Sequence, residues 1–390
     1  MGRILDYIEK SGGGKYVCYK TKKLSLDYND NDTLAYEDKP VSQFKKSVFA
    51  ETDQTRKQTV RITGTLIENT PPIFRYFLDG SRHTYKVDDI AIGKRIFPIV
   101  AGQVIVGCCE RKGRDKFKKY DILQKLIMSL PDDFDDDDGG ENFCRLYCEN
   151  INADLANIHF VKERGLKIAR LLLYKTDGNS EFGQGKDNFK NRAVAKIQAE
   201  MTDDEQLLVA DLCKKNKLDD DSWLIKDGSL EYNPRFSNLE TTQWNNLRSN
   251  YSHVVGISKS FDPELLADYE GNRLSKVIAN LKPFERTKVY KYESSHNGNS
   301  FAVWYLRLRN KEYRETHFSD IVKCELVLHK EGELKDTDLI NTISANIIRE
   351  AYPVCYGADS RWSNHLYPIF LTESFCKSNY IDSNIILSLF

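Results

Sequence analysis

Two Asp-Gly-Ser tripeptides are the positions in this chain best suited to chemistry. Asp79-Gly80-Ser81 follows the apolar run Ile73–Leu78, and Asp227-Gly228-Ser229 follows Trp223–Lys226. A run of β-branched and aromatic residues that ends at Gly is typical of a buried strand, so each Asp is expected at a strand end. Two carboxylates held side by side repel each other, and one would bind a proton unless a cation neutralised the pair. The tripeptides therefore predict a divalent-metal site that contains both Asp residues.

A third acid is expected on a helix between them. An apolar stripe at helical spacing contains Glu205, and its other members are Val194, Ile197, Met201, Leu208 and Leu212. A carboxylate on the core face of a helix needs a reason, and metal ligation is one. The alternative is that Thr202–Glu205 is a capping box, in which Glu205 closes the start of the helix. Glu205 can be both a metal ligand and part of the cap if the first turn of the helix points at the strand ends. Glu200 is the second choice of metal ligand on this helix.

Three acids in this arrangement are suited to cutting phosphodiester bonds. They can hold one or two Mg²⁺ or Mn²⁺ ions, which activate water and stabilise the leaving oxygen. The order of strand Asp, hairpin strands, helix Glu and strand Asp resembles the RNase H-like nuclease fold. The expected fold class is therefore α/β, an RNase H-like mixed sheet flanked by helices, with insertions.

The elements that must position these acids can be placed along the chain. Helices are expected over residues 3–10, Tyr120–Leu130, Ala193–Lys215 with a break, and Asp336–Tyr352. An antiparallel meander is expected from Pro72 to Cys109, with its first strand ending at Asp79, a second near His83–Val87 and a third over Ile99–Gly107. Further strands are expected at Thr59–Leu66, Leu166–Tyr174, Trp223–Asp227, Val254–Lys259, Lys288–Glu293, Phe301–Arg309 and Cys324–His329, with a hairpin turn at Asn297-Gly298.

We expect an N-terminal extension over residues 1–70 and one nuclease-like domain over 70–390. The chain has 390 residues, 40% of them apolar, which is enough for a large core. An acidic stretch near 131–141 lacks the ligand spacing of an EF-hand and is expected to be a solvated loop.

Net charge, hydrophobicity and cysteine content limit the kinds of partner and cellular compartment that are expected for this protein. The formal net charge is −1, so binding of nucleic acid has to come from a local basic surface. No apolar run approaches the roughly 18 residues of a membrane-spanning helix, and the N-terminus has no signal-peptide core. Nine Cys residues without a Cys-x-x-Cys pair favour reduced thiols over a zinc site. We therefore expect a cytoplasmic protein that does not bind membranes.

In its ordered motifs the sequence resembles the NurA nuclease family. The resembling residues are Phe77–Arg82, the helix acid near Glu205, Leu224–Leu230, Val255–Ser260 and Tyr367-Pro368. Asp-Gly-Ser alone is an ordinary turn sequence, so it is the order of the set that carries the resemblance.

The resemblance implies a Mn²⁺-dependent deoxyribonuclease with 5′-to-3′ exonuclease and single-strand endonuclease activity, acting in DNA repair or in defence against foreign DNA. It also implies a homodimer that docks on a hexameric HerA-type ATPase translocase. Since the chain has no Walker A loop, a partner would have to drive the DNA. By position, Asp79, Glu205 and Asp227 would be metal ligands, Lys259 would lie near the scissile phosphate, and Tyr367 would shape the site. Without the resemblance, Lys259 is more simply a solvated turn residue.

One stretch departs from the family pattern. After Tyr-Pro the family usually carries a polar pair that includes His, whereas this chain has Phe375 where the His is expected. Glu373 or His365 would have to compensate, and without compensation metal binding or rate would be reduced.

A basic run is the expected contact with DNA. Arg111, Lys112, Arg114 and Lys116 are followed by aromatic residues, a combination that can track a phosphate backbone. Arg82, directly after the first motif, is a further candidate. The alternatives are a solvated edge for the run and a surface salt bridge for Arg82.

Two other functions are compatible with the sequence. A non-catalytic partner subunit would keep the acids only as turns, and Phe375 favours it. A phosphotransferase of the actin-like or sugar-kinase class also carries two Asp-Gly-Ser/Thr phosphate loops, but it leaves Glu205 and Tyr367 without a role.

Overall fold

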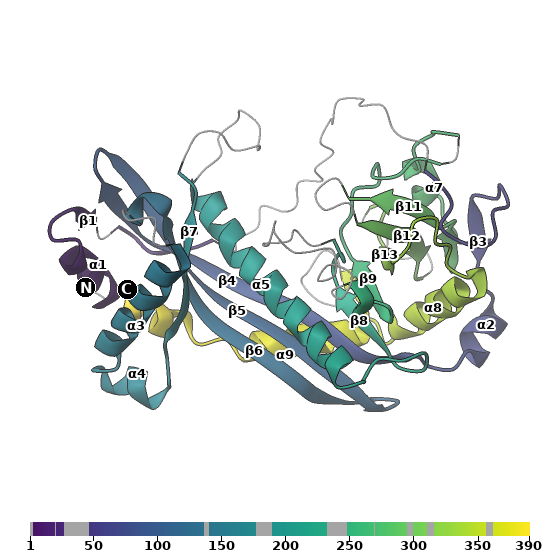
Figure 1. Ribbon diagram of the computed structural model, residues 1–390. Helices are drawn as coiled ribbons and strands as arrows, with labels where there is room; N and C mark the ends of the chain where they lie inside the picture. Colours follow the sequence, from purple (N-terminus) through teal and green to yellow (C-terminus); the bar gives the residue numbers. More distant parts are fainter. Residues whose placement is uncertain are drawn as a thin grey trace.

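The computed structural model describes residues 3–19, 21–26, 47–135, 140–176, 189–231, 248–268, 270–294, 299–309, 316–355 and 362–390 (Figure 1). Within these ranges, thirteen strands form one mixed sheet. The strands are β1 (Tyr16–Cys18), β2 (Leu24–Ser25), β3 (Thr59–Arg61), β4 (Phe74–Ile92), β5 (Arg95–Gly113), β6 (Lys116–Pro131), β7 (Ile168–Tyr174), β8 (Trp223–Asp227), β9 (Val254–Ser258), β10 (Glu285–Thr287), β11 (Tyr290–Glu293), β12 (Ser300–Arg307) and β13 (Ile321–Leu328). The helices are α1 (Arg3–Ser11), α2 (Gly64–Asn69), α3 (Gly140–Leu155), α4 (His159–Glu163), α5 (Phe189–Lys214), α7 (Ser275–Ala279), α8 (Thr337–Glu350), α9 (Tyr367–Ser378) and α10 (Ser383–Leu389).

The centre of the sheet has the strand order β6-β5-β4-β8-β9. β4, β5 and β6 form an antiparallel meander, whereas β8 runs parallel to β4 and β9 runs parallel to β8. Parallel strands need a long crossover between them, and α5 lies in the connection that leads from the meander to β8. The predicted RNase H-like mixed sheet flanked by helices is confirmed.

The sheet continues beyond this centre on both sides. β7 pairs parallel with β6, and β13, β12 and β10 extend the sheet beyond β9. Segments before residue 70 join the same sheet, since β1 and β2 pair with β4 and β3 pairs with β10.

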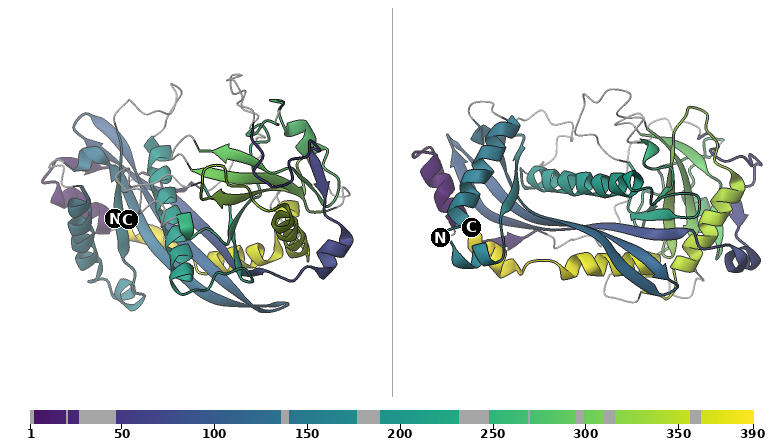
Figure 2. Two further views of the ribbon diagram at one scale, coloured as in Figure 1. Left: turned by 45° about the vertical axis from the view of Figure 1, so that its right-hand side comes forward. Right: turned by 60° about the horizontal axis from the view of Figure 1, so that its bottom comes forward.

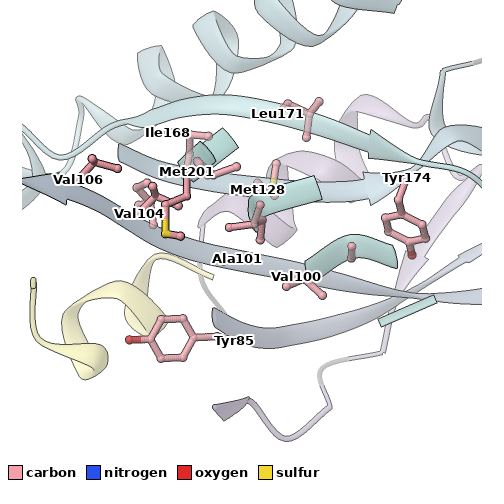
Figure 3. Packing of buried hydrophobic residues seen from close by; sticks show 14 of the residues in the cluster. Tyr85, Val100, Ala101, Val104, Val106, Met128, Ile168, Leu171, Tyr174 and Met201 are labelled. Carbon is pink, nitrogen blue, oxygen red and sulfur yellow. The ribbon is translucent and has the colours of Figure 1, made fainter. Parts of the chain in front are cut away.

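Helices cover both faces of the central strands. α5 crosses one face of the meander and α9 lies on the opposite face (Figure 2). Because successive strand residues point to opposite faces, Leu78 and Leu224 belong to the core under α5, while Phe77 and Ile225 belong to the core that includes residues of α8 and α9. Figure 3 shows the first core, where sheet residues lie near Met201 of α5.

The first Asp-Gly-Ser motif does not end a strand, which corrects the sequence prediction. β4 continues from Phe74 to Ile92 and pairs with β5 along this length, so no separate strand begins near His83. Gly80 is needed for packing instead of for a turn. A Cβ at Gly80 would lie 2.6 Å from Glu205 Oε1 and 3.1 Å from Met201 Cγ, so the missing side chain lets α5 approach β4 closely.

Two helix predictions are also corrected. Tyr120–Leu130 lies in strand β6, where pairing with β5 and β7 overrides the helical spacing of its apolar residues. α5 begins at Phe189 and continues without a break to Lys214. Glu205 therefore lies deep inside a helix, and the capping-box interpretation of Thr202–Glu205 is wrong.

β8, β9, the β11–β12 hairpin and α8 are confirmed, and the N-cap Asp336 of α8 accepts a hydrogen bond from the amide of Asp338. The strand expected over Thr59–Leu66 is β3 only as far as Arg61, and α2 begins at Gly64. The turn of the β11–β12 hairpin at 295–298 and residues 136–139 of the acidic stretch lie outside the described residues. None of the described helices combines the length and the apolar character that crossing a bilayer requires.

Candidate active site

The sheet divides at Asp79. β8 pairs with β4 from Phe74 to Leu78, whereas β5 stays paired with β4 as far as Ile92. Asp79 is therefore the first residue of β4 beyond the pairing with β8. β8 itself ends at Asp227, so the carboxyl ends of parallel strands meet beside Asp79. In open α/β sheets, this is the kind of edge where ligands bind.

A cavity of about 470 Å³ opens at this division. α5 forms one wall, and the turns that follow β8 and β9 form others. Its charged lining contains both acids and lysines, namely Asp79, Glu205, Asp227, Glu231, Lys226, Lys259 and Lys323. The structure thus brings Asp79, Glu205, Asp227 and Lys259 to one place.

Asp79 differs from the other charged residues of the cavity because its carboxylate is buried without a partner among the described residues. It is 5% exposed, and within the described part of the chain no hydrogen bond or ion pair reaches its carboxylate. Burial raises the pKa of Asp79 well above its usual value, and Asp227 raises it further, against the opposing effect of Lys259. Glu373 and then Glu205 raise the same pKa by smaller amounts. A buried carboxylate without a partner is costly unless a cation or a proton balances it.

Lys259 places a positive charge among the acids. Its Nζ is 2.9 Å from Asp227 Oδ2 and 3.6 Å from Glu373 Oε2, and its side chain is 9% exposed. Burial alone would lower the pKa of Lys259, but the carboxylates around it raise the pKa above its usual value, so the ammonium form is kept. The carbonyl of Lys259 accepts a hydrogen bond from Asn364 Nδ2 at 2.9 Å, which anchors the turn.

Glu205 has a partner of its own. Its Oε2 lies 2.9 Å from Lys226 Nζ, and the two side chains are 6% and 5% exposed. Lys226 Nζ also donates to the carbonyl of Asp227 at 2.9 Å. Burial raises the pKa of Glu205, while Lys226 opposes the rise. This is a closed ion pair at the wall of the cavity formed by α5.

Glu373 reaches Lys259 from α9, on the other face of the sheet. Its Oε1 is 2.7 Å from the exposed Lys377, and its Oε2 is buried without a hydrogen-bond partner, 3.8 Å from His365 Nδ1. Burial would raise the pKa of Glu373, but Lys259, Lys377 and His365 together outweigh this effect and the pKa is lowered. Sequence reasoning gave Glu373 only a compensating role, because nothing near it in the sequence links α9 to the two Asp motifs. The ring of Phe375 packs beside Gly107.

Two other candidate residues lie away from the cavity. Glu200, 1% exposed, is bound by Lys125 at 2.7 Å and by Arg170 at 3.2 Å, and it does not line the cavity. Tyr367 lines a separate depression of about 740 Å³, with its ring 6.4 Å from that of Phe117. Of the two acids considered for α5, the structure therefore places Glu205 and not Glu200 at the cavity.

The basic residues fall into two places. Arg82 Nε donates to Oε1 of Gln198, a residue of the cavity wall, at 2.5 Å. The others lie toward the end of the β5–β6 hairpin. Arg111 forms an ion pair with Glu350, and its guanidinium lies 5.3 Å from the ring centroid of Phe77.

The tip of this hairpin is open to solvent. Lys112 Nζ is 2.7 Å from Glu110 Oε1, and Arg114 and Lys116 are exposed. Gly107, the residue paired with Asp79, precedes Gly113 by six positions along β5, a span of about 20 Å at roughly 3.3 Å per residue. The hairpin tip is therefore outside the cavity.

The donor set suits a hard divalent cation. Carboxylate oxygens are the ligands that Mg²⁺ and Mn²⁺ prefer, and both Asp79 and Oε2 of Glu373 lack a hydrogen-bond partner among the described residues. Among those residues, no group of three or more His, Cys, Asp or Glu side chains is placed so that it could hold a metal ion. Instead, Lys226 holds Glu205 and Lys259 holds Asp227. A cation at this site would exchange with the contact between Lys259 and Asp227.

No protein-family model matches the chain, and no curated protein matches its sequence. Among solved structures, the chain is similar to the NurA nuclease from Sulfolobus solfataricus, with a TM-score of 0.40 and 10% identity over 80% of this chain and 83% of that chain. This is the family that the sequence motifs resemble. At this degree of similarity, the function has to follow from the residues of the site.

Proposed function

We propose that this protein is a divalent-metal-dependent nuclease that hydrolyses phosphodiester bonds of DNA, with Asp79 and Asp227 as its central acids. The observation that carries the proposal is the Asp79 carboxylate, which is buried, lacks a partner within the described residues and lines a cavity beside Asp227 and Lys259. Such a charge destabilises a fold, so its presence in a cavity favours a functional role.

The residues of the cavity divide the chemistry among them. Asp79 and Asp227 would hold Mn²⁺ or Mg²⁺ through carboxylate oxygens, and the bound ion would supply Lewis-acid stabilisation and an activated water. The Lys259 ammonium would contact a phosphate oxygen and stabilise the negative charge that develops there. Arg82, which donates to Gln198 of the cavity wall, and Arg111, Lys112, Arg114 and Lys116, along the hairpin, would hold the DNA backbone.

The finer activities in this proposal come from the resemblance in sequence. They are a preference for Mn²⁺, 5′-to-3′ exonuclease and single-strand endonuclease activity, and a cytoplasmic role in DNA end processing or defence. A homodimer would act with a hexameric HerA-type ATPase that moves the DNA. Tyr367 lies outside the cavity, so in this proposal it would contact the DNA before the DNA reaches the cavity.

The test is cleavage of linear single-stranded and double-stranded DNA by the full chain in Mn²⁺, Mg²⁺ or a chelator. We expect cleavage with Mn²⁺ and none with chelator. Asp79→Asn and Asp227→Asn should each lower the rate at least about 100-fold, because each removes a carboxylate that the cation needs. Glu149→Gln, which changes a 58% exposed acid on α3, is the matched control and should cleave like the wild type.

Full activity in both Asp variants would contradict the proposal. A chain that neither cleaves DNA nor binds Mn²⁺, yet binds a HerA-type ATPase, would instead be a non-catalytic subunit. The phosphotransferase alternative predicts thermal stabilisation by ATP, which the proposed nuclease should not show.

A further inference from the structure

The charged side chains of the cavity lie on two faces of the sheet. Lys226 Nζ contacts Glu205 of α5, whereas the next residue of β8, Asp227, points to the opposite face, toward Lys259. Asp227 and Lys259, which act on the scissile bond in the proposed function, are therefore on that opposite face. We call the face covered by α5 the α5 side of the cavity, and the proposed function gives the lysines of this side no role.

Lys323 of β13 brings a further ammonium to the α5 side. Its strand neighbours Val322 and Cys324 belong to the core that includes residues of α8 and α9, so the side chain of Lys323 points the other way, and it lines the cavity. Its Nζ is 2.5 Å from Glu325 Oε1, which is the one ion pair or hydrogen bond of this ammonium within the described residues. An ammonium has three N–H donors, so two remain for a ligand in the cavity.

The other two lysines of the cavity have more partners. Lys226 Nζ contacts Glu205 and also donates to the carbonyl of Asp227 at 2.9 Å. Lys259 lies between two carboxylates, at 2.9 Å from that of Asp227 and 3.6 Å from that of Glu373. Lys323 is thus the lysine of this cavity with the most donors to offer a ligand.

A hydroxyl lies directly across the β-ladder from Lys323. Ser258 of β9 is the residue paired with Lys323, and paired side chains share one face with their Cβ atoms about 4.5–5.5 Å apart. Ser258 is 7% exposed and lines the cavity, and in the described part of the chain no hydrogen bond engages its hydroxyl. Lysine ammonium and serine hydroxyl groups are common ligands of the phosphate oxygens of nucleic acids.

Glu325 fixes both the ammonium and the turn beside it. Its Oε2 accepts hydrogen bonds from Ser229 Oγ at 2.8 Å and from the amide of Leu230 at 2.7 Å, in the turn that follows β8. Because this buried carboxylate has both oxygens occupied, it holds Lys323 Nζ in one place. The serine of the second Asp-Gly-Ser motif therefore ties the turn after Asp227 to β13.

Lys323 and Lys259 approach the cavity from neighbouring positions. Lys259 directly follows Ser258, and adjacent strands are about 4.8 Å apart. A DNA strand carries a phosphate at every nucleotide, so a strand whose scissile phosphate is at Lys259 can place a neighbouring phosphate at Lys323.

We infer that Lys323 and Ser258 form a phosphate-binding subsite on the α5 side of the cavity, which holds a phosphate of the DNA strand next to the scissile one. Glu325 is the positioning residue of this subsite. The inference rests on the proposed function, because it requires a DNA strand in the cavity, and it adds the place where the uncleaved part of that strand is held.

The first test compares steady-state cleavage of a short single-stranded DNA in Mn²⁺ by the full-length wild type and Lys323→Met. We expect KM to rise at least about tenfold and kcat to stay within about threefold, because this lysine binds a phosphate that does not react. Lys323→Arg keeps a cation at the same place and should recover most of the affinity. Ser258→Ala, which removes one neutral donor, should raise KM about threefold.

Lys335→Met is the matched control. Lys335 Nζ is also 2.5 Å from a glutamate two residues away, Glu333, and its side chain is 14% exposed against 12% for Lys323, but Lys335 does not line the cavity. This variant should keep KM and kcat within about twofold of wild type.

A second measurement identifies the phosphate. A set of single-stranded substrates carries one uncharged methylphosphonate linkage each, at successive positions around the cleaved bond. At one position beside that bond, the wild type should lose about tenfold in kcat/KM and Lys323→Met less than about twofold, because the lysine and the missing charge are the two ends of one contact. A purely structural ion pair would give equal losses in both proteins.

The outcomes separate the subsite from the function on which it rests. An unchanged KM in folded Lys323→Met, or equal losses of the two proteins at every methylphosphonate position, would overturn the subsite and leave the nuclease in place. A wild type that does not cleave DNA in Mn²⁺ would overturn the proposed function and the subsite with it. Circular dichroism reports the fold of each variant. If Lys323→Met is unfolded, Ser258→Ala decides with the same substrates, since it should lose less than the wild type at the same position.

Discussion

At the scale of single residues, Asp79 is held where it destabilises the metal-free protein. It is buried next to Asp227 without a hydrogen bond from the described residues, while the nearby acids Glu205 and Asp227 each have a lysine. A side chain selected only for packing at this position would be apolar or neutral. We therefore attribute the loss of stability caused by the buried Asp79 charge to a functional requirement, and this loss should be measurable.

Asp79→Asn should make the metal-free protein more stable. Removing the charge relieves both its desolvation and its repulsion by Asp227, and we expect about 1–2 kcal/mol, or a rise of a few degrees in Tm. The same variant should lose the increase in Tm that Mn²⁺ gives the wild type. Thermal unfolding with and without Mn²⁺ measures both effects, and Asp220→Asn, at a fully exposed carboxylate, should show neither change. A less stable metal-free Asp79→Asn protein would contradict this account.

Gly80→Ala should have the opposite effect on stability. The added Cβ would lie 2.6 Å from Glu205 Oε1, so Glu205 has to move and its pairing with Lys226 is disturbed. We expect a loss of about 1–3 kcal/mol in urea unfolding. Gly64→Ala is the control, since a Cβ there meets nothing within 4 Å, and it should leave stability nearly unchanged or slightly raised. Equal stabilities of the two variants would show that Gly80 has no packing role.

At the scale of elements, the sequence predicted those strands that are short, apolar and buried on both faces. β8 begins with the apolar run Trp223–Ile225, β9 is apolar up to Ile257, and α8 has both a helical apolar stripe and an Asp cap. β6 was misjudged because its Ile and Leu residues recur at helical spacing, and only its two neighbouring strands decide its conformation. The sequence placed Asp79 and Asp227 beside each other on the expectation that each ends a strand. Asp227 does end β8, whereas β4 continues past Asp79 and only its pairing with β8 stops there. It did not reveal that Glu373 joins them, because α9 reaches the site only through tertiary packing.

The β5–β6 hairpin gives a prediction that belongs to this scale. If its tip follows the DNA backbone, Arg114→Ala/Lys116→Ala should weaken binding of single-stranded DNA and reduce the slope of log affinity against log salt by about 1.4, which is two phosphate contacts. Fluorescence anisotropy at several salt concentrations measures the slope. Lys162→Ala/Lys167→Ala changes exposed lysines near α4, at the other end of the molecule, and should keep the wild-type slope (Figure 1). An unchanged slope in the hairpin variant would place the DNA elsewhere.

At the scale of the whole molecule, a buried ion cluster ties the early chain to the late strands. Glu51 Oε2 is 2.8 Å from Arg286 Nη2, and Glu51 Oε1 accepts from the amide of Val289 at 2.9 Å and lies 3.8 Å from Lys288 Nζ. The Glu51, Arg286 and Lys288 side chains are fully buried. Segments more than 230 residues apart in sequence are thus joined by charges that cannot be solvated, as the separation of 235 between Glu51 and Arg286 shows.

Glu51→Gln should therefore destabilise the protein strongly. Removing the Glu51 charge leaves Arg286 buried without an acidic partner among the described residues, while Lys288 keeps Asp53 at 2.7 Å, and we expect a cost of about 3–5 kcal/mol. Urea unfolding measures the loss, and Glu68→Gln, on the exposed side of α2, should change stability by less than about 0.5 kcal/mol. Mn²⁺ binding by the folded fraction should be unchanged, because Glu51 does not line the cavity. A small loss would mean that water reaches the cluster.

Because the sheet divides at Asp79, the floor and the rim of the cavity are formed by different segments of the chain. The floor is β4, whose register is set by β5 along nearly its whole length, while the rim is made of the turns that follow β8 and β9. Insertions or substitutions in those turns can widen or narrow the entrance without shifting the carboxylate below. Under the proposed nuclease function, related proteins built on this plan could diverge in the DNA that they admit while keeping the carboxylates of the cavity unchanged.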